Sequence, residues 1–490
     1  MARPILTVAR CSRLLGMAES ELAYMTATDA LAAMHSRALS PIDYLEALIE
    51  RIERLEPTIN AVAERRYTEA RLEAEASAAR YADGTARPLE GLPVAAKEEH
   101  PMTGRSWTQG SLTLVDEVAP YDHPIIERIQ ASGGIIHIRT TTPEFCCAGF
   151  CHSRLWGVTR NPWNTDFSPG GSSGGSGAAL AAGYAPLATG SDIGGSIRIP
   201  SSLSGVVGFK PPWARVPALP PYNLDQFCHD GPMARTVADC ALLEDVIAGA
   251  HWRDPASMPY PPMVGEAGRS VEGLRIAVCL QLGDWPLDPD VERNTRRVAA
   301  SLREAGATVD EVTLPWTIAD VWATAQAHFA TIMGAGILAV DREFGEQLSD
   351  YTRAFAHDFT TDPELGFYAG LEHEGEMWEP LGILFQTYDA LVCPTMATSG
   401  YEAGNAYLTG GLSIGDGHVH HHILGAMTLP FNILSRCPVV AAPSGRAFNG
   451  VPTGVQVVGH PYDDVMAFRV AAAVEATGVG FPFEQWRPPV

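Results

Sequence analysis

Basic residues are scarce in this chain. Its 490 residues include 34 Lys and Arg against 57 Asp and Glu, which gives a formal net charge of −23. Proteins that bind nucleic acids or anionic membranes need basic patches to neutralise phosphate, so we expect neither partner. No apolar run approaches the roughly 20 residues of a membrane span, and no apolar stretch follows the N-terminal arginines, which argues against a secretory signal.

Cysteine pairs typical of disulfide frameworks or zinc sites are also missing. Nine cysteines are scattered from Cys11 to Cys437 without a C-x-x-C pair, and the spacing of Cys146, Cys147 and Cys151 does not match a standard zinc site. This usage favours a reduced, cytoplasmic protein with buried thiols. A chain of this length can bury a large core without a disulfide or metal. We therefore expect no cofactor and no metal.

Apolar periodicity predicts an α/β fold. Residues 19 to about 80 have a helical pattern: Ser40-Pro41 reads as a helix start, and Pro57 is predicted to end that helix. Strand-like and helix-like segments alternate from residue 92 onwards, beginning with a short apolar strand that ends at Lys97. This alternation indicates a sheet core with packed helices.

Two glycine- and serine-rich segments carry the densest signal for chemistry. SPGGSSGGSGAALAAG covers residues 168–183, and GSDIGGSIRIPSS covers residues 190–202. Glycines allow a backbone to approach a substrate closely, and successive N–H groups in such turns can bind a developing oxyanion. Ser172 and Ser196 stand in these tight glycine settings. They are therefore candidate nucleophiles.

A serine needs a base to remove its proton, and the usual histidine is missing here. None of the 15 histidines lies in either segment. A lysine whose pKa is lowered by burial is the alternative base. Lys97 follows a short apolar strand, where its side chain could emerge at the floor of a site. We therefore expect burial to lower the pKa of Lys97.

Simpler readings of these segments remain open at this stage. Gly170-x-Ser172-x-Gly174 matches a nucleophile elbow, which would make Ser172 the nucleophile of an α/β-hydrolase. The glycine-rich run could be a linker or a phosphate loop, although no Walker pattern occurs. A histidine cluster, His418, His420, His421 and His422, could bind a metal, but a loop that lines the pocket is the more favoured interpretation.

Several motifs together resemble the amidase signature family. They are GLPVAAKEE (91–99), the glycine- and serine-rich run, GSDIGGSIRIPSSLSGVVGFKP (190–211), DGPMARTVAD (230–239), YDALVCPT (388–395) and GVPTGVQVVG (450–459). The separations of 75 positions from Lys97 to Ser172 and 24 from Ser172 to Ser196 are those expected for the family. The resemblance runs from about residue 20 to the last helix.

The resemblance implies a fold and its parts. It implies a large mixed β-sheet core covered by helices on both faces, with an N-terminal helical segment. Residues 1–18 would be an N-terminal extension, for which disorder is one expectation. A single domain would follow over residues 19–490. Within that domain we expect N-terminal helices at 19–85, the catalytic region at 86–250, a Pro-rich linker-like loop at 251–270 and the rest of the core at 271–490.

The resemblance also implies the roles of individual residues. Ser196 would be the nucleophile, Ser172 would relay the proton, and Lys97 would be the base, neutral in the resting enzyme. The Gly171–Ser172 peptide would be cis, and Asp192 would pair with Arg198. The backbone N–H groups at the start of the second loop would form the oxyanion hole, those of Ile193, Gly194, Gly195 and Ser196. Cys146, Gly171 and Ser173 would bind the substrate.

The implied function is a hydrolase that cleaves the C–N bonds of small or aryl carboxamides, with ester and carbamate cleavage as side activities. Such an enzyme would be a monomer or homodimer acting on a small-molecule amide. Aromatic residues lean weakly towards an aryl substrate, although they could equally be core: Trp156, Trp163, Trp213 and Phe227. The alternative is the glutaminase subunit of a tRNA-dependent amidotransferase, against which the net charge argues. The sequence departs from the family pattern at Glu98, 138–141 and 210–215. These departures do not affect Lys97, Ser172 or Ser196.

Overall fold

One large mixed sheet forms the centre of the molecule. The structure, a computed structural model, describes residues 19–261, 268–359, 366–480 and 487–490. In these residues eleven strands pair in the order β1-β3-β2-β6-β8-β7-β14-β15-β11-β9-β10. Their bounds are β1 (Val62–Arg65), β2 (Pro93–Lys97), β3 (Ile135–Thr140), β6 (Leu187–Asp192), β7 (Val207–Lys210), β8 (His229–Ala234), β9 (Arg275–Val278), β10 (Thr308–Glu311), β11 (Ala390–Pro394), β14 (Val439–Arg446) and β15 (Pro452–Gly459).

Parallel and antiparallel pairs alternate in blocks across this sheet. Strand β2 pairs in parallel with β3 and β6, and β9 pairs in parallel with β10 and β11. The central strands from β6 to β11 pair antiparallel. Two small hairpins lie outside the sheet: β4 (His152–Ser153) with β5 (Gly157–Val158), and β12 (Leu412–Ile414) with β13 (Gly417–Val419).

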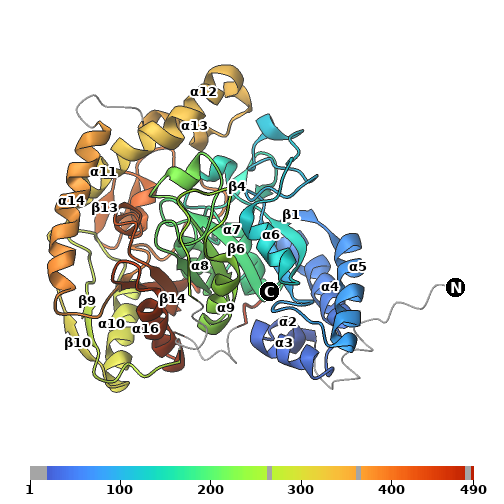
Figure 1. Cartoon of the computed structure of the whole chain (residues 1–490). Helices are drawn as coiled ribbons and strands as arrows, with labels where there is room; N and C mark the ends of the chain where they lie inside the picture. Colours follow the sequence, from blue (N-terminus) through green and yellow to red (C-terminus); the bar gives the residue numbers. More distant parts are fainter. Residues whose placement is uncertain (1–18, 262–267, 360–365, 481–486) are drawn as a thin grey trace.

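Helices cover both faces of the sheet (Figure 1). The helices are α2 (Glu19–Ala23), α3 (Ala27–His35), α4 (Pro41–Ile59), α5 (Tyr67–Asp83), α6 (Pro124–Ala131), α7 (Gly174–Ala182), α8 (Arg198–Ser204), α9 (Val237–Ile247), α10 (Pro289–Glu304), α11 (Ile318–Phe329), α12 (Ala335–Phe344), α13 (Asp350–Asp358), α14 (Phe367–Leu384), α15 (Pro430–Ile433) and α16 (Asp464–Ala476). Single turns of 3₁₀ helix are η1 (Leu112–Leu114), η2 (Glu144–Cys146), η3 (Tyr222–Leu224), η5 (Gly345–Gln347) and η6 (His422–Gly425), and the π-helical turn η4 (Ala330–Gly334) joins α11 to α12.

Successive side chains along strand β2 pack into two different hydrophobic cores. Val94 and Ala96 of β2 pack in the cluster that also holds the apolar sides of α6, α9, α10 and α16. Ala95 packs in the cluster of α7. Since successive side chains of a strand point to opposite faces, each strand serves both layers. The predicted mixed sheet with helices on both faces and an N-terminal helical segment is confirmed.

Two local predictions in the N-terminal region are wrong. Helix α4 continues past Pro57 to Ile59 and ends at Asn60, whose backbone is left-handed with φ 56°. The region predicted to be helical also contains β1, which pairs antiparallel with β3 at the sheet edge. Four residues are too few to show strand alternation, and tertiary pairing decides their structure.

Three further segments bear on the sequence predictions. The predicted extension over residues 1–18 lies outside the described residues. In the Pro-rich segment 251–270, the described residues form no helix or strand, and buried Asp254 accepts a hydrogen bond from the Ala218 N–H at 3.1 Å. Residues 318–347 are long and apolar enough to cross a membrane by composition, but half of the most apolar window is buried within the protein. Core helices pass the same test, so this stretch carries no conclusion.

Candidate active site

The end of β2 places Lys97 on the face of the sheet that α7 covers. Ala95 packs against α7, and a side chain two positions further along a strand lies on the same face. The backbone N–H of Lys97 donates to Thr189 Oγ1 of β6 at 3.0 Å, which fixes the strand end. The Lys97 side chain is fully buried. The sequence prediction that this lysine emerges at the floor of a site agrees with this position.

The Lys97 ammonium nitrogen has three oxygen neighbours. It donates to Ser172 Oγ at 2.7 Å and to Ser191 Oγ at 2.7 Å. It also forms an ion pair with Glu99 Oε2 at 2.8 Å. The contact between Lys97 and Ser172, which the family resemblance implied, is present. Ser191 and Glu99 were not among the predicted site residues.

The two serine segments are tied together directly before α7. The Gly171–Ser172 peptide is cis, as predicted. A Cβ atom on Gly171 would lie 2.2 Å from the Phe150 carbonyl oxygen, so this position requires glycine. The Ser173 N–H donates to the Ser196 carbonyl oxygen at 3.1 Å, which brings Ser196 beside the Ser172 segment. Of the three candidate catalytic side chains only Ser196 is exposed at all, at 7%.

In the second glycine loop, one N–H group of the predicted oxyanion hole has a protein acceptor. The Gly195 N–H donates to Asp192 Oδ1 at 2.8 Å. The hydrogen bonds of the described residues leave the N–H groups of Ile193, Gly194 and Ser196 without a protein acceptor. Gly195 has φ 126°, and a Cβ there would lie 2.1 Å from Thr428 Oγ1. Its backbone conformation therefore allows the tight turn, and its N–H binds Asp192 in this structure; its part in the oxyanion hole stays a prediction.

A buried ion pair supports this loop from beneath. Arg198 binds both oxygens of Asp192 at 2.9 Å, and both side chains are completely buried. Arg198 also donates to Gln456 Oε1 at 2.7 Å and to Asn432 Oδ1 at 2.6 Å. Burial raises the pKa of Asp192, but the charge and hydrogen bonds of Arg198 lower it by more than burial raises it. The net direction is therefore strongly downward. The predicted pair between Asp192 and Arg198 is confirmed.

Replacing Arg198 with Ala is expected to lower the free energy of unfolding by about 3–5 kcal/mol, because it leaves the Asp192 carboxylate buried without its partner. The measurement is a denaturant titration at neutral pH. The matched control is Arg296→Ala, which removes an arginine whose side chain is 50% exposed in its ion pairs and which we expect to cost about 1 kcal/mol or less. Equal losses in both variants would contradict this role for Arg198.

A narrow apolar cavity opens beside Ser196. Its volume is about 20 Å³, close to the space that one water molecule needs. The side chains around it come from several distant elements: Cys146, Cys147, Ile193, Ile199, Phe329, Met333, Phe355 and Ile423. The aromatic residues suggested by the sequence do not line this cavity in the described part of the chain: Trp156, Trp163, Trp213 and Phe227.

The three predicted substrate-binding residues differ in position. Cys146 lines the cavity, and both Phe145 and Cys146 have left-handed backbones, with φ 50° and 58°. Such conformations cost energy in residues other than glycine and cluster at functional sites. Ser173 is fully buried, and its hydroxyl donates to the Ser191 carbonyl oxygen at 3.3 Å. Ser173 and Gly171 therefore shape the backbone of the site, whereas Cys146 faces the cavity.

The pKa of Lys97 shifts in the direction opposite to the prediction. Burial lowers the pKa of Lys97, but the neighbouring Cys146 and Glu99 side chains raise it, and the net direction is upward. Burial raises the pKa of the Cys146 thiol to about 12, so this thiol is uncharged at neutral pH and Glu99 is the negative group beside Lys97. The expected net lowering of the pKa of Lys97 is not found, because the Glu99 carboxylate, 2.8 Å from the amine, outweighs the effect of burial.

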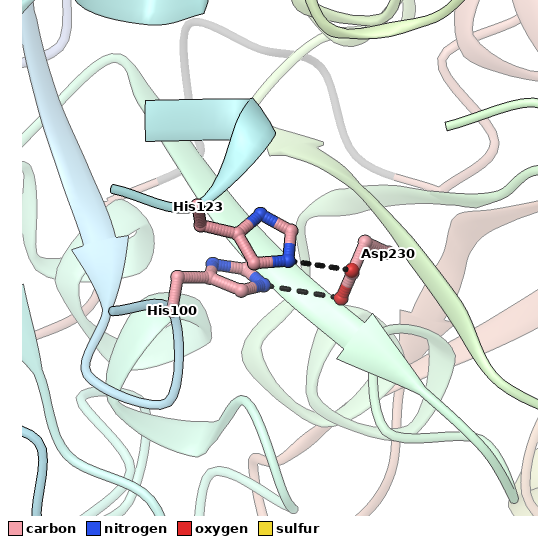
Figure 2. Close-up of side chains that lie close together, drawn as sticks. All are labelled: His100, His123 and Asp230. Atoms are coloured by element: carbon pink, nitrogen blue, oxygen red, sulfur yellow. Dashed lines mark hydrogen bonds and ion pairs between the residues drawn. The ribbon is translucent and has the colours of Figure 1, made fainter. Parts of the chain in front are cut away.

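Behind Glu99, two histidines share one aspartate. His100 Nε2 lies 3.1 Å from Asp230 Oδ1 and His123 Nε2 lies 3.3 Å from Asp230 Oδ2, as Figure 2 shows. All three side chains are buried, and their nearest ligand atoms lie within 4.8 Å of one another, close enough for one metal ion to reach all three. The other ring nitrogens also have partners, Thr189 Oγ1 for His100 and the Ile125 N–H for His123. The cluster is thus complete as a hydrogen-bond network that braces the strand ends.

Three histidines of the 418–422 cluster, His420, His421 and His422, pack against aromatic rings. His420 and His421 contact Trp322 with ring centroids 4.9 Å apart, and His421 pairs with Asp358 at 3.5 Å. His422 is buried, and the next residue, Ile423, lines the cavity beside Ser196. The loop therefore reaches the pocket, as the sequence suggested, through Ile423.

Comparisons with known proteins agree with this geometry. The family model described as Amidase matches residues 43–468. An acylamidase of Rhodococcus erythropolis is 32% identical over 94% of this chain and 97% of its own length. A glutamyl-tRNA(Gln) amidotransferase subunit of Chloroflexus aggregans is 34% identical over 93% and 97%.

Solved structures give the same result. A bacterial aryl acylamidase has a TM-score of 0.86 at 27% identity, over 93% of this chain and 96% of its own. The 6-aminohexanoate cyclic dimer hydrolase bound to its substrate has a TM-score of 0.83 at 26% identity, over 95% and 99%. With the family model matching most of the sequence and the serine–lysine contact in place, this chain belongs to the amidase signature family.

Proposed function

We propose that this chain hydrolyses carboxamide C–N bonds through an acyl-enzyme on Ser196. The observation that carries the proposal is the 2.7 Å hydrogen bond between Lys97 and Ser172, whose segment is hydrogen-bonded to Ser196, which lines the cavity and is 7% exposed. A buried amine in contact with a hydroxyl can remove a proton through it. In the same loop as Ser196, the N–H groups of Ile193, Gly194 and Ser196 have no acceptor among the described residues, and an oxyanion would form beside them.

The acylation step follows from these contacts. In the fraction of the enzyme whose Lys97 amine is neutral, Ser196 Oγ attacks the amide carbon while its proton passes to Ser172 Oγ, and the Ser172 proton passes to that amine. The carbonyl electron pair moves to oxygen, which the N–H groups of Ile193, Gly194 and Ser196 stabilise. The C–N bond then breaks, and the leaving nitrogen takes a proton from Ser172. Ser172 regains one from Lys97, which is neutral again.

Water completes the cycle by the same route. It attacks the ester carbon of the acyl-enzyme and gives a proton to Ser172, which passes its own proton to Lys97. When the tetrahedral intermediate collapses, the bond to Ser196 Oγ breaks and that oxygen takes back a proton through Ser172. The carboxylic acid leaves, and Ser196, Ser172 and Lys97 return to their starting states.

The cavity indicates an apolar acyl group. Phe329, Met333 and Phe355 wall it, and no charged side chain among the described residues lines it. A carboxylate or ammonium buried there would lose its hydration without a partner. A group larger than a water molecule also requires these side chains to move. Small aliphatic or aryl amides therefore suit the site, with esters and carbamates as further substrates.

A glutaminase subunit is the second candidate. The 34% identity to an amidotransferase subunit favours it. Glutamine, however, carries both an ammonium and a carboxylate. The apolar walls of the cavity provide no partner for either charge. The net charge of −23 also disfavours close contact with tRNA.

A panel of purified substrates separates the two candidates. We expect p-nitroanilides with small apolar or aryl acyl groups to have kcat/KM values at least roughly 10²-fold above that of glutamine, since burying an unpaired charge costs several kcal/mol. The panel includes matched esters and carbamates, and it is repeated with amidotransferase partner subunits. Glutamine as the preferred substrate, alone or with those subunits, would replace the amidase proposal with the glutaminase one.

A further inference from the structure

Glu99 lies two positions after Lys97 and closes a ring of contacts with it. We propose that Glu99 is a positioning residue that fixes the Lys97 amine and sets the pH range in which that amine accepts a proton. The inference rests on the proposed function of Lys97 as the base. It assigns to Glu99 a role that acts on the substrate only through Lys97.

The contacts form a closed triangle. Glu99 Oε2 lies 2.8 Å from Lys97 Nζ and accepts a hydrogen bond from Ser191 Oγ at 2.6 Å. Ser191 Oγ in turn accepts one from Lys97 Nζ at 2.7 Å. With Ser172 as the third acceptor, all three protons of the ammonium form have a partner. This arrangement therefore fits Lys97 in its protonated state.

The neutral amine fits the same positions with one change. It has two N–H donors, which can remain on Ser191 and Glu99, and one lone pair, which then faces Ser172. The Ser172 hydroxyl can donate to that lone pair, which is the direction that proton removal requires. Glu99 and Ser191 thus hold the amine so that only its bond to Ser172 reverses as the proton moves.

Among the ionisable groups around this site, Glu99 is the negative charge nearest to Lys97. Burial raises the pKa of the Cys146, Cys228 and Tyr222 side chains, so these are uncharged at neutral pH. The two carboxylate oxygens of Asp230 each contact a buried histidine, His100 or His123. The Glu99 side chain is 24% exposed, and the net direction of its pKa is downward despite burial, because Lys97 and His100 lower it.

The carboxylate has two opposite effects on the rate. It favours the ammonium form, so a smaller fraction of the enzyme has a neutral Lys97 at a given pH. It also makes the neutral amine a stronger base once it exists. Removing the charge should therefore shift the acid limb of the pH profile to lower pH and lower the alkaline plateau.

The test compares Glu99→Gln with wild type in pH profiles of kcat/KM on a neutral anilide. We expect the midpoint of the acid limb to move down by about one pH unit or more, with a lower alkaline plateau, so that the two profiles cross. Glu46→Gln is the matched control, since Glu46 pairs with Arg71 on the N-terminal helices. Profiles that differ only by a constant factor, or that coincide, would overturn the inference.

A second readout separates this inference from the proposed function. The rate at which a fluorophosphonate labels Ser196 reports the reactivity of the hydroxyl without turnover. We expect labelling of Glu99→Gln to show the same shift in midpoint. If the label is on Ser196 and the midpoint does not move, the role of Glu99 is wrong while the nucleophile stands. If Ser196 is not labelled in wild type, the proposed function itself fails.

Discussion

Replacing Ser196 with Ala is expected to lower kcat/KM for amide hydrolysis by roughly 10⁴-fold or more, because no other group takes the place of a covalent nucleophile. Ser196 is 7% exposed and lines the cavity, so the loss of one oxygen leaves little empty space. The measurement is the initial rate on an anilide at alkaline pH. Thermal unfolding should be close to that of wild type.

Ser301→Ala is the matched control for this change. Ser301 is also nearly buried, and its hydroxyl donates to the Val298 carbonyl within α10 at 2.9 Å. That helix packs on the opposite face of the sheet from α7. We expect Ser301→Ala to keep its activity. Residual activity of Ser196→Ala within tenfold of wild type would remove Ser196 as the nucleophile.

Replacing Lys97 with Met is expected to lower kcat/KM by about 10²–10⁴-fold, the usual contribution of a general base. Methionine fills a similar volume, which matters because the site of Lys97 is fully buried. The loss should be accompanied by a flatter pH profile, since the group whose deprotonation limits the rate is gone. Initial rates between pH 6 and 10 measure both effects.

Lys97→Arg distinguishes a base from a fixed positive charge. Arginine can still pair with Glu99 but stays protonated in proteins, so it cannot accept a proton. We expect this variant to be as inactive as Lys97→Met. Activity close to wild type in Lys97→Arg would show that the positive charge, and not proton removal, is what the site uses.

Local sequence was sufficient for those parts of the site that depend on neighbours in the chain. Lys97 at a strand end is visible in the short apolar run before it. The pairing of Asp192 with Arg198, six positions apart, came from the family resemblance. The contact of Lys97 with Ser172, 75 positions away, came from the family resemblance and not from periodicity.

Features that a tertiary contact decides were not predictable from the sequence. The Gly195 N–H turns towards Asp192, and no sequence pattern gives the direction of one N–H group. The walls of the cavity come from Phe329 and Phe355, more than 100 residues after Ser196. Glu99 lies in the turn after β2, where the two-residue alternation of a strand no longer applies, so its contact with Lys97 is also set by the tertiary structure.

The most direct test of Ser196 as the nucleophile is to locate a covalent label. Wild-type protein is treated with a fluorophosphonate, digested and sequenced by mass spectrometry. We predict one modified residue, Ser196, and no modification in Ser196→Ala. A label on Ser172 or on any other residue of the active wild-type enzyme, or hydrolysis that continues after complete labelling elsewhere, would contradict it.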